Sequence, residues 1–554
     1  MKKLFSVLLV LTMVLALGVP AFAATQYTLT ISNSTAGYTY DAYQIFKGDV
    51  DGTGANATLS NIEWGDSINS ANLLTALSLA ATTTAADLAK DLTGSSPTVT
   101  LAQLTAALDV SGVLTTAKYT QSTQNTAGTG YDLVMDGGYY FIKNSVVPAG
   151  GSYTKYMVQL VETSTASHKG DVPTVEKWVK DINNSYAIVS GTNPTDWQKS
   201  ADHDIGDTVE YKFQGTLPSA YDSYNAYKYE FTDTMVNGLT YNASSLKVYL
   251  VHTDNGSDYY YPIPTTAYTA SPTSDTAGAT LTVKFADLKA ITRDKTDRIA
   301  VYYTATLNTN AVVGNPGNDN KVYLTFSNNP NASGTGDPST PSYPTNPGTP
   351  GEPTNPTNPT TSNDDVNPGT PGNPGNDTQN TPESKAIVFT YQLTVNKVKE
   401  DPTDATKTVA LTGAGFTLYK WDASLATPDW VAVKVDANGK LDSTGNAEIK
   451  GTTANPISKF EWIGLDDGKY KLVESTVPNG YNKMTDLEFE VTATHTTQLD
   501  TLSTNKSNIF TCTVATGSTN PSGSIVGDIK NEPGTLLPET GGIGTTPFYV
   551  GGAV

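Results

Sequence analysis

Two ionisable side chains lie where strand alternation would bury them. In "LTVNKVKE", alternation places Leu393, Val395 and Lys397 on one face of a strand. In "YKLVEST", Leu472 and Glu474 share a face in the same way. Burial disfavours charge, so it favours a neutral amine on Lys397 and a protonated carboxyl on Glu474. A neutral amine is a nucleophile and a protonated carboxyl can polarise an amide, so Lys397 could attack the Asn531 side chain while Glu474 shuttles protons. The alternative is a simple ion pair.

The segment "YKLVESTVPNGY" resembles the E-box, YxLxETxAPxGY, of Gram-positive pilins and surface adhesins. The residues that match are Tyr470, Leu472, Glu474, Pro478, Gly480 and Tyr481. Ser475 and Val477 are conservative departures. The resemblance implies a CnaB-like, reversed immunoglobulin sandwich in which a first-strand lysine becomes amide-bonded to a last-strand asparagine. The matching positions are Lys397 and Asn531, and Glu474 would be the acid that promotes this isopeptide bond.

The middle of the chain repeats this pattern in "DVPTVEKWVKDIN", "YEFTDTMVNGLTY" and "NKVYLTFSNNP". These segments resemble the isopeptide-forming D2 domain of major pilins, a CnaA-like fold in which an aspartate replaces the glutamate. The resemblance implies Lys177 as the amine, Asp233 as the acid and Asn328 as the amide. Lys180 and Asn320 are the alternative lysine and asparagine. Asp233 could instead be a turn former at a strand end.

Near the C-terminus, "LLPETGG" is an extended peptide stiffened by proline. It resembles the LPxTG sorting signal of sortase substrates, made here of Leu537, Pro538, Glu539, Thr540 and Gly541. The resemblance implies cleavage between Thr540 and Gly541. Family members continue with a hydrophobic segment and a basic tail, whereas "GIGTTPFYVGGAV" is too short to span a bilayer, so we expect a truncated tail.

A polymerising pilin also needs a lysine that accepts the acyl-threonine of the next subunit. The family motif WxxxVxVYPK is matched poorly by "YMVQLVETSTASHKGDVPTVEK", which has neither Trp nor Tyr-Pro-Lys. Lys169 is the predicted acceptor because it lies at a domain junction, eight residues before Lys177. Lys155 is the second choice, and an ordinary linker lysine is the alternative interpretation.

The N-terminus predicts export. Lys2 and Lys3 precede the apolar run "LFSVLLVLTMVLALGV", and small residues follow at Ala21 and Ala23, so residues 1–23 are predicted to be a signal peptide. The chain of 554 residues has one cysteine, which excludes an intrachain disulfide and leaves room for another covalent link. Its 34 basic and 54 acidic residues, net charge −20, argue against nucleic acid and anionic membrane surfaces as partners.

Composition and alternation divide the mature chain. Residues 24–170 are predicted to be an N-terminal pilin domain, with helical spacing in "SANLLTALSLAATTTAADLAKDL" and "VTLAQLTAALDV". Residues 171–330 and 386–533 are predicted to be sandwiches, and residues 534–554 contain the sorting signal. Residues 331–385 repeat Asn-Pro and Pro-Gly units, which predicts a semi-rigid spacer between two bodies. We expect a mainly β protein of tandem immunoglobulin-like (CnaA/CnaB-type) sandwiches, with short helices in the N-terminal domain.

No metal or cofactor site is predicted. The run "DVDGTG" from Asp49 lacks the Glu that completes an EF-hand loop. The four histidines are scattered through the chain, at His168, His203, His252 and His495. The first strand of the N-terminal domain, "QYTLTIS", has no lysine, so we expect no cross-link there.

The whole mature chain resembles the major backbone subunit of a sortase-assembled Gram-positive pilus. The resemblance implies a structural protein of the cell wall and surface pilus, catalytic only in cross-linking itself once. The implied partners are sortase, identical pilin subunits, accessory pilins, cell-wall peptidoglycan and host surface ligands, with no nucleic acid. The alternative is a monomeric wall-anchored adhesin or a tip or base pilin. A carbohydrate-active enzyme would need paired catalytic carboxylates, and the sequence singles out no such pair.

Overall fold

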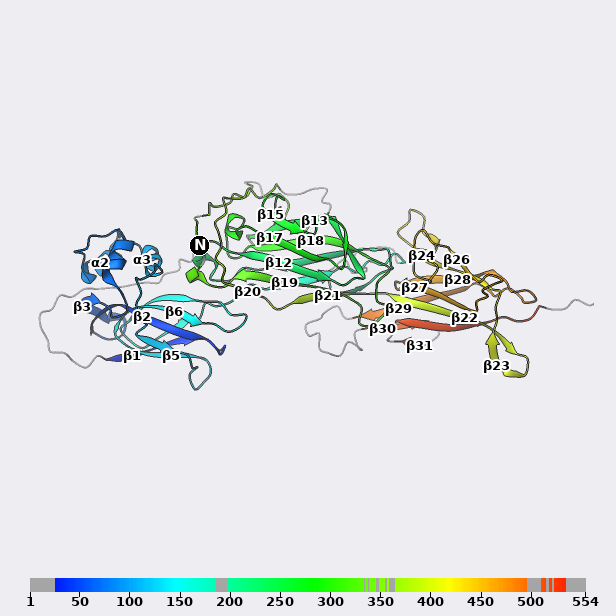
Figure 1. Ribbon diagram of the computed structural model, residues 1–554, viewed down its shortest axis with the longest axis horizontal. Helices are drawn as coiled ribbons and strands as arrows, with labels where there is room; N and C mark the ends of the chain where they lie inside the picture. Colours follow the sequence, from blue (N-terminus) through cyan, green and yellow to red (C-terminus); the bar gives the residue numbers. More distant parts are fainter. Residues whose placement is uncertain are drawn as a thin grey trace, which may run out of the picture.

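The computed structural model describes residues 25–185, 197–332, 334–336, 338–344, 348–353, 356–357, 364–495, 510–514, 518–520 and 523–534. The predicted signal peptide and the predicted sorting signal, Leu537 to Gly541, lie outside these residues. The described part is mainly β, as predicted, and Figure 1 shows its sandwich domains in a row along the longest axis. No helix in the described ranges is long and apolar enough to cross a membrane.

The N-terminal domain has two sheets, of order β5-β1-β8 and β3-β2-β6-β7, with β4 on β2. Its elements are β1 (Gln26–Ser32), β2 (Thr39–Asp51), η1 (Gly54–Asn56), β3 (Thr58–Trp64), α1 (Ser70–Ala76), α2 (Ala85–Leu92), α3 (Leu101–Leu108), β4 (Tyr119–Gln121), β5 (Gly130–Asp136), β6 (Gly138–Val146), β7 (Lys155–Leu160) and β8 (Ser164–Ser167). The helices lie where the sequence predicts them. Capping boxes begin α2 at Thr84 and α3 at Thr100, and these satisfy backbone N–H groups at the helix starts.

The middle domain packs a sheet of order β10-β21-β19-β12-β17-β15 against one of order β14-β13-β18-β11-β9. The first part comprises β9 (Val175–Val179), β10 (Ser200–Asp202), β11 (Thr208–Gly215), η2 (Tyr221–Ser223), β12 (Tyr229–Met235), β13 (Leu239–Asp254) and β14 (Ser257–Pro262). The second part comprises β15 (Tyr268–Ser271), β16 (Thr276–Ala277), β17 (Thr280–Phe285), η3 (Leu288–Ala290), β18 (Arg298–Leu307), β19 (Asn318–Ser327), η4 (Pro330–Ala332), β20 (Thr378–Asn380) and β21 (Ser384–Phe389). Alternating apolar residues of both inner faces form one core.

The described residues of the Pro-rich segment, 331–377, which is most of the predicted spacer at 331–385, lie on the middle domain. After this segment the chain returns to the middle domain, where β20 and β21 both pair with β19. On the way it docks on the sandwich: Gly351 N donates to Asp258 O at 2.8 Å, and Val366 N donates to Pro262 O at 2.9 Å. Val366 itself is buried at 1% exposure. A Pro- and Gly-rich chain without apolar periodicity can therefore still be ordered, through backbone hydrogen bonds and a few anchoring side chains.

The C-terminal domain begins one residue after β21. Its sheets have the orders β23-β22-β27, with β32 on β22, and β25-β24-β28-β29-β30-β31, with β26 on β24. The strands are β22 (Tyr391–Asp401), β23 (Asp404–Ala410), β24 (Gly415–Asp422), β25 (Asp429–Ala432), β26 (Glu448–Lys450), β27 (Lys459–Leu465), β28 (Gly468–Thr476), β29 (Leu487–His495), β30 (Phe510–Val514), β31 (Ser518–Asn520) and β32 (Ser524–Lys530). The first strand, β22, and the last, β32, lie side by side and parallel.

Candidate cross-linking centres and acceptor lysine

The C-terminal domain brings Lys397, Glu474 and Asn531 together between its sheets. Lys397 is on β22, and Asn531 follows β32, whose Ile529 lies opposite Lys397 in the parallel register. Glu474 is on β28 in the other sheet. Lys397 and Glu474 are fully buried because each lies on the inward, apolar face of its strand, and Asn531, directly after β32, is 2% exposed.

The three side chains contact one another directly. Lys397 Nζ lies 3.0 Å from Glu474 Oε1 and donates a hydrogen bond to Asn531 Oδ1. Asn531 Nδ2 donates to the same Glu474 Oε1 at 3.0 Å, and Met484 N donates to Glu474 Oε2 at 2.8 Å. Burial lowers the pKa of Lys397, whose Nζ also lies 5.2 Å from the centre of the Phe416 ring. The carboxyl therefore bridges the amine and the amide.

A second buried centre lies in the middle domain, on four strands from both sheets. Lys177 is on β9 and Tyr303 on β18, while Asp233 is on β12 and Asn320 on β19. All four residues are fully buried. The structure thus brings together the predicted lysine and acid, adds the alternative asparagine, and places a tyrosine among them.

Tyr303 connects the groups of this centre. Lys177 Nζ donates to Asp233 Oδ2, and also to the Tyr303 hydroxyl at 2.6 Å. The Tyr303 hydroxyl donates to Asp233 Oδ1 at 3.1 Å and accepts from Asn320 Nδ2 at 2.7 Å. Burial lowers the pKa of Lys177 to about 8 and raises the pKa of Asp233. Burial therefore favours the neutral forms of both groups, despite the attraction between their charges.

Asn328, the amide predicted from the sequence, does not reach this centre. In the antiparallel pairing of β12 and β19, Asp233 lies opposite Val322. Asn320 is two residues from Val322, whereas Asn328 is six residues away on the other side, about 20 Å along an extended chain. Asn328 Nδ2 instead donates to Gly151 O at 3.4 Å, at the contact with the N-terminal domain. Asn320, the alternative asparagine, is therefore the one that lies at this centre, and Asn328 lies away from it.

Two further residues, Lys180 and Tyr303, show how the sequence prediction compares with this centre. Lys180, the alternative lysine, lies outside the centre, because its Nζ pairs with Glu210 at 2.9 Å. Tyr303 was not selected from the sequence. Its stretch "RIAVYYTATL" shows an apolar strand whose inward face includes Tyr303, but nothing local indicates that the hydroxyl meets Asn320.

The two candidate acceptor lysines differ in their surroundings. Lys169 is exposed and lies shortly after β8, where its backbone N donates to the Tyr156 hydroxyl at 3.2 Å. Lys155 is 16% exposed, and its Nζ pairs with Asp109 at 3.0 Å. Both lysines line two adjoining grooves of about 520 and 410 Å³. Of the two residues, Lys169 is the more exposed.

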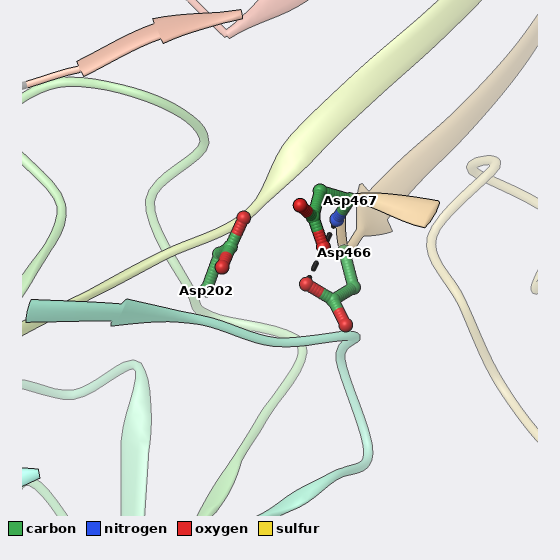
Figure 2. Close-up of side chains that lie close together, drawn as sticks. All are labelled: Asp202, Asp466 and Asp467. Carbon is green, nitrogen blue, oxygen red and sulfur yellow. Dashed lines mark hydrogen bonds between the residues drawn. The ribbon is translucent and has the colours of Figure 1, made fainter. Parts of the chain in front are cut away.

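An acidic cluster lies where the middle and C-terminal domains meet. Figure 2 shows Asp202, Asp466 and Asp467, whose carboxylate oxygens lie within 4.8 Å of one another. Lys420 is 8% exposed beside them, and its Nζ lies 3.3 Å from Asp466 and 2.5 Å from Asp204 of the middle domain. Burial disfavours the charge on Lys420, but the attraction of these two carboxylates outweighs it and raises the pKa of Lys420. The cluster is therefore an ion-pair network that joins two domains.

Two family models match the chain. Residues 205–330 match the Gram-positive pilin backbone subunit 2, Cna-B-like domain, and residues 396–506 match the SpaA prealbumin-like fold domain. The first description is CnaB-like, whereas the sequence resemblance implies a CnaA-like middle domain. These two domains define a class of structural proteins, the Gram-positive pilin backbone subunits. The matched parts of this chain are therefore similar to a CnaB-like domain of Gram-positive backbone pilins and to a prealbumin-like domain.

The fold is similar to those of solved pilins. The T6 backbone pilin of Streptococcus pyogenes is 16% identical, with a TM-score of 0.49, covering 94% of this chain and 100% of that one. The major pilin SpaD of Corynebacterium diphtheriae is 14% identical, with a TM-score of 0.43, covering 93% and 98%. The fimbrial protein FimP of Actinomyces oris is 13% identical, with a TM-score of 0.40, covering 92% and 98%. A search of curated proteins gave no match.

Proposed function

We propose that this chain is a backbone pilin, a sortase substrate that polymerises covalently, and that its middle and C-terminal domains each close a Lys–Asn isopeptide bond. The observation that carries the proposal is the mutual contact of Lys397, Glu474 and Asn531 in a buried site. A simple ion pair would need only the first two residues. The third residue is an amide, which is the electrophile that the amine requires.

The geometry of the C-terminal centre supports a proton shuttle. Glu474 Oε1 takes a proton from Lys397 Nζ, which leaves a neutral amine beside the Asn531 side chain. The amine attacks Asn531 Cγ, and Glu474 returns the proton to Nδ2. Nδ2 already donates a hydrogen bond to Glu474, so the two atoms are in contact before the reaction. Nζ gives its extra proton to Glu474, ammonia leaves, and Nζ and Cγ remain joined by a neutral amide. The bond links the first strand of the domain to its last.

The middle domain supports the same reaction between Lys177 and Asn320, with Asp233 as the acid. Lys177 is the buried amine, and Asp233 is placed to take its proton. The bond would join β9 to β19 across the two sheets. We expect no such bond in the N-terminal domain.

Polymerisation follows from the sorting signal and the exposed lysine. Sortase would cleave after Thr540, and the acyl group would pass to Lys169 of the next subunit. The exposure of Lys169 supports this choice over Lys155, whose side chain is 16% exposed. Accessory pilins, peptidoglycan and host surface ligands are the further partners of such a fibre, and adhesion is its expected biological role.

Intact mass tests the internal bonds. Each bond releases one ammonia, so the wild-type chain should be lighter than its sequence by about 17 Da per bond, or about 34 Da in total. Glu474→Ala should remove one loss, and Asn320→Ala the other. Asn328→Ala is the matched control and should keep both losses. A wild-type mass equal to that of the sequence would overturn the cross-links.

Fibre composition tests polymerisation. Lys169→Ala should abolish the SDS-resistant ladder of pilin polymers on the cell surface while both internal mass losses remain, because an exposed side chain contributes little to the core. Lys155→Ala is the control and should leave the ladder. Tandem mass spectrometry should find "LPET" joined to the Lys169 peptide. If "LPET" is joined only to cell-wall peptide, the chain is a monomeric adhesin.

A further inference from the structure

The two centres differ in how the carboxyl reaches the amide. In the C-terminal centre, Glu474 accepts a hydrogen bond from Asn531 Nδ2 directly. In the middle centre, Asn320 Nδ2 donates to the Tyr303 hydroxyl, and that hydroxyl donates in turn to Asp233. One more group is therefore inserted between the acid and the nitrogen that must leave.

We propose that Tyr303 is a catalytic residue of the middle domain, whose hydroxyl holds the Asn320 amide and relays a proton from Asp233 to the departing nitrogen. This inference rests on the proposed cross-link between Lys177 and Asn320. In this proposal Tyr303 accepts the hydrogen bond from the asparagine side-chain nitrogen, as Glu474 does in the C-terminal domain.

The hydroxyl contacts both reacting groups and the acid. It lies 2.6 Å from Lys177 Nζ, 2.7 Å from Asn320 Nδ2 and 3.1 Å from Asp233 Oδ1. Asn320 Oδ1 is buried and has no hydrogen-bond partner among the residues that the structure describes. The hydrogen bond from Nδ2 to Tyr303 thus has an important part in orienting the amide.

The tyrosine ring is held in place independently of its hydroxyl. It stacks on Tyr211 with the ring centres 5.4 Å apart and the planes at 15°. It also meets the edge of Tyr241 at 5.7 Å and the tilted ring of Phe213 at 6.2 Å. A phenylalanine at position 303 would keep these contacts, so the hydroxyl can be removed without emptying the core.

The relay balances without any added reagent. Asp233 accepts a proton from Lys177 Nζ, and the neutral amine attacks Asn320 Cγ to give a tetrahedral intermediate. Asp233 passes a proton to the Tyr303 oxygen while the tyrosine gives its own proton to Nδ2. The former lysine nitrogen then gives one of its two protons to Asp233, and the departing nitrogen, which now holds three hydrogens, leaves as ammonia. Tyr303 ends in its initial protonation state, and Asp233 keeps the one extra proton that the lysine contributed.

The test compares Tyr303→Phe with Tyr302→Phe in the full-length chain. Tyr302 is the neighbouring residue on β18, so it points to the opposite face of the sheet and is a matched control. The chain is isolated and kept unfolded in guanidinium, refolded by dilution, and quenched at intervals for intact mass and peptide mapping. The Lys397–Asn531 bond of the same molecule is the internal reference for folding.

We expect Tyr303→Phe to slow formation of the Lys177–Asn320 bond by about 100-fold or more, the effect of losing a positioned proton-transfer group. The C-terminal bond should form at the wild-type rate, and Tyr302→Phe should behave as wild type in both domains. A middle bond that forms equally fast in Tyr303→Phe overturns the catalytic role. A wild-type chain with no middle bond at all overturns the proposed cross-link instead.

A second measurement separates chemistry from folding. In an Asn320→Ala background no middle bond can form, so adding Tyr303→Phe reports only on packing. We expect the melting temperature of the double variant to equal that of Asn320→Ala. A large drop, together with equal slowing of both bonds in Tyr303→Phe, would show that the hydroxyl is needed for folding and would overturn its role as a relay.

Discussion

At the scale of single residues, both centres place an amine beside a carboxyl where water is excluded. Lys177 and Asp233 are fully buried, as are Lys397 and Glu474. A buried ion pair contributes little net stability, because desolvation offsets the attraction between the charges. In the middle centre the same desolvation favours the neutral forms of Lys177 and Asp233, which are the forms that the proposed reaction requires.

The rate of the middle cross-link should depend on pH. The reactive state holds one proton between Lys177 and Asp233, placed on the carboxyl. Lys199, Tyr211 and Tyr303 also face the pair, and Lys199 helps burial to lower the pKa of Lys177. Above the pKa of Lys177, about 8, the pair loses that proton and the departing nitrogen has no donor. Below the raised pKa of Asp233 the amine is charged.

We therefore expect a rate that is flat near neutral pH and falls above about pH 8. The measurement is intact mass after refolding the full-length chain in buffers of increasing pH. Asn320→Ala is the control for mass changes from other causes, such as deamidation. A rate that keeps rising through pH 9 would contradict the shared proton and would indicate that amine deprotonation alone limits the reaction.

At the scale of elements, strand order explains why each bond would matter. In the C-terminal domain β22 and β32 are neighbours, so a link from Lys397 to Asn531 closes almost the whole domain into a loop. The Pro-rich segment is the second feature at this scale, since it covers part of the middle sandwich and returns as β20 and β21. The segment is part of the domain because of its backbone hydrogen bonds and the buried Val366 side chain, which its composition does not predict.

The anchor at Val366 provides a test of that statement. Val366→Ala should lower the free energy of unfolding of the middle domain by about 1–3 kcal/mol, because a buried branched side chain is truncated. Val312→Ala is the control, since Val312 is 43% exposed in the same domain, and it should have little effect. Both are measured by chemical denaturation in the Asn320→Ala background, where no cross-link masks unfolding. Equal effects of the two changes would show that the segment is an undocked spacer.

At the scale of the whole molecule, the middle and C-terminal domains are held together by non-covalent contacts as well as by the chain that connects them. Lys420 of the C-terminal domain pairs with Asp204 of the middle domain. Ile205 N donates to Gly464 O at 2.8 Å, and Ala423 N donates to Asn184 O at 2.7 Å. Contacts of this kind would transmit force between domains of a fibre without a flexible joint.

Replacement of Lys420 should loosen this junction. Lys420→Met keeps the apolar stem but leaves Asp204 and Asp466 buried without their cation, a change that costs about 3–5 kcal/mol in buried pairs. Hydrogen exchange should become faster at the amides of Ile205 and Ala423, while amides in the centre of each sandwich are unchanged. Lys471→Met is the control, because that lysine contacts Trp430 within its own domain. Unchanged exchange at both amides would contradict the role of Lys420.

The sequence by itself determined the features that depend on neighbouring residues. Strand alternation predicted that Lys397 and Glu474 face the core, and the family resemblance carried by the E-box implied Asn531 as their partner. The structure brings these three residues into contact. Helical spacing likewise located α1, α2 and α3. These patterns are local, because side-chain direction repeats every two residues in a strand and every 3.6 in a helix.

Only the tertiary structure decided the features that depend on pairing between distant segments. Asn320 and Asn328 have the same parity, so alternation treats them alike, and the register of β19 against β12 alone places Asn320 near Asp233. Tyr303 reaches this centre because β18 and β19 lie in facing sheets. The Pro-rich segment joins the middle domain through backbone hydrogen bonds to residues far away in sequence. The alternation of side chains along one strand does not indicate which distant residue each side chain will contact. That contact depends on how the strands pair and how the sheets stack.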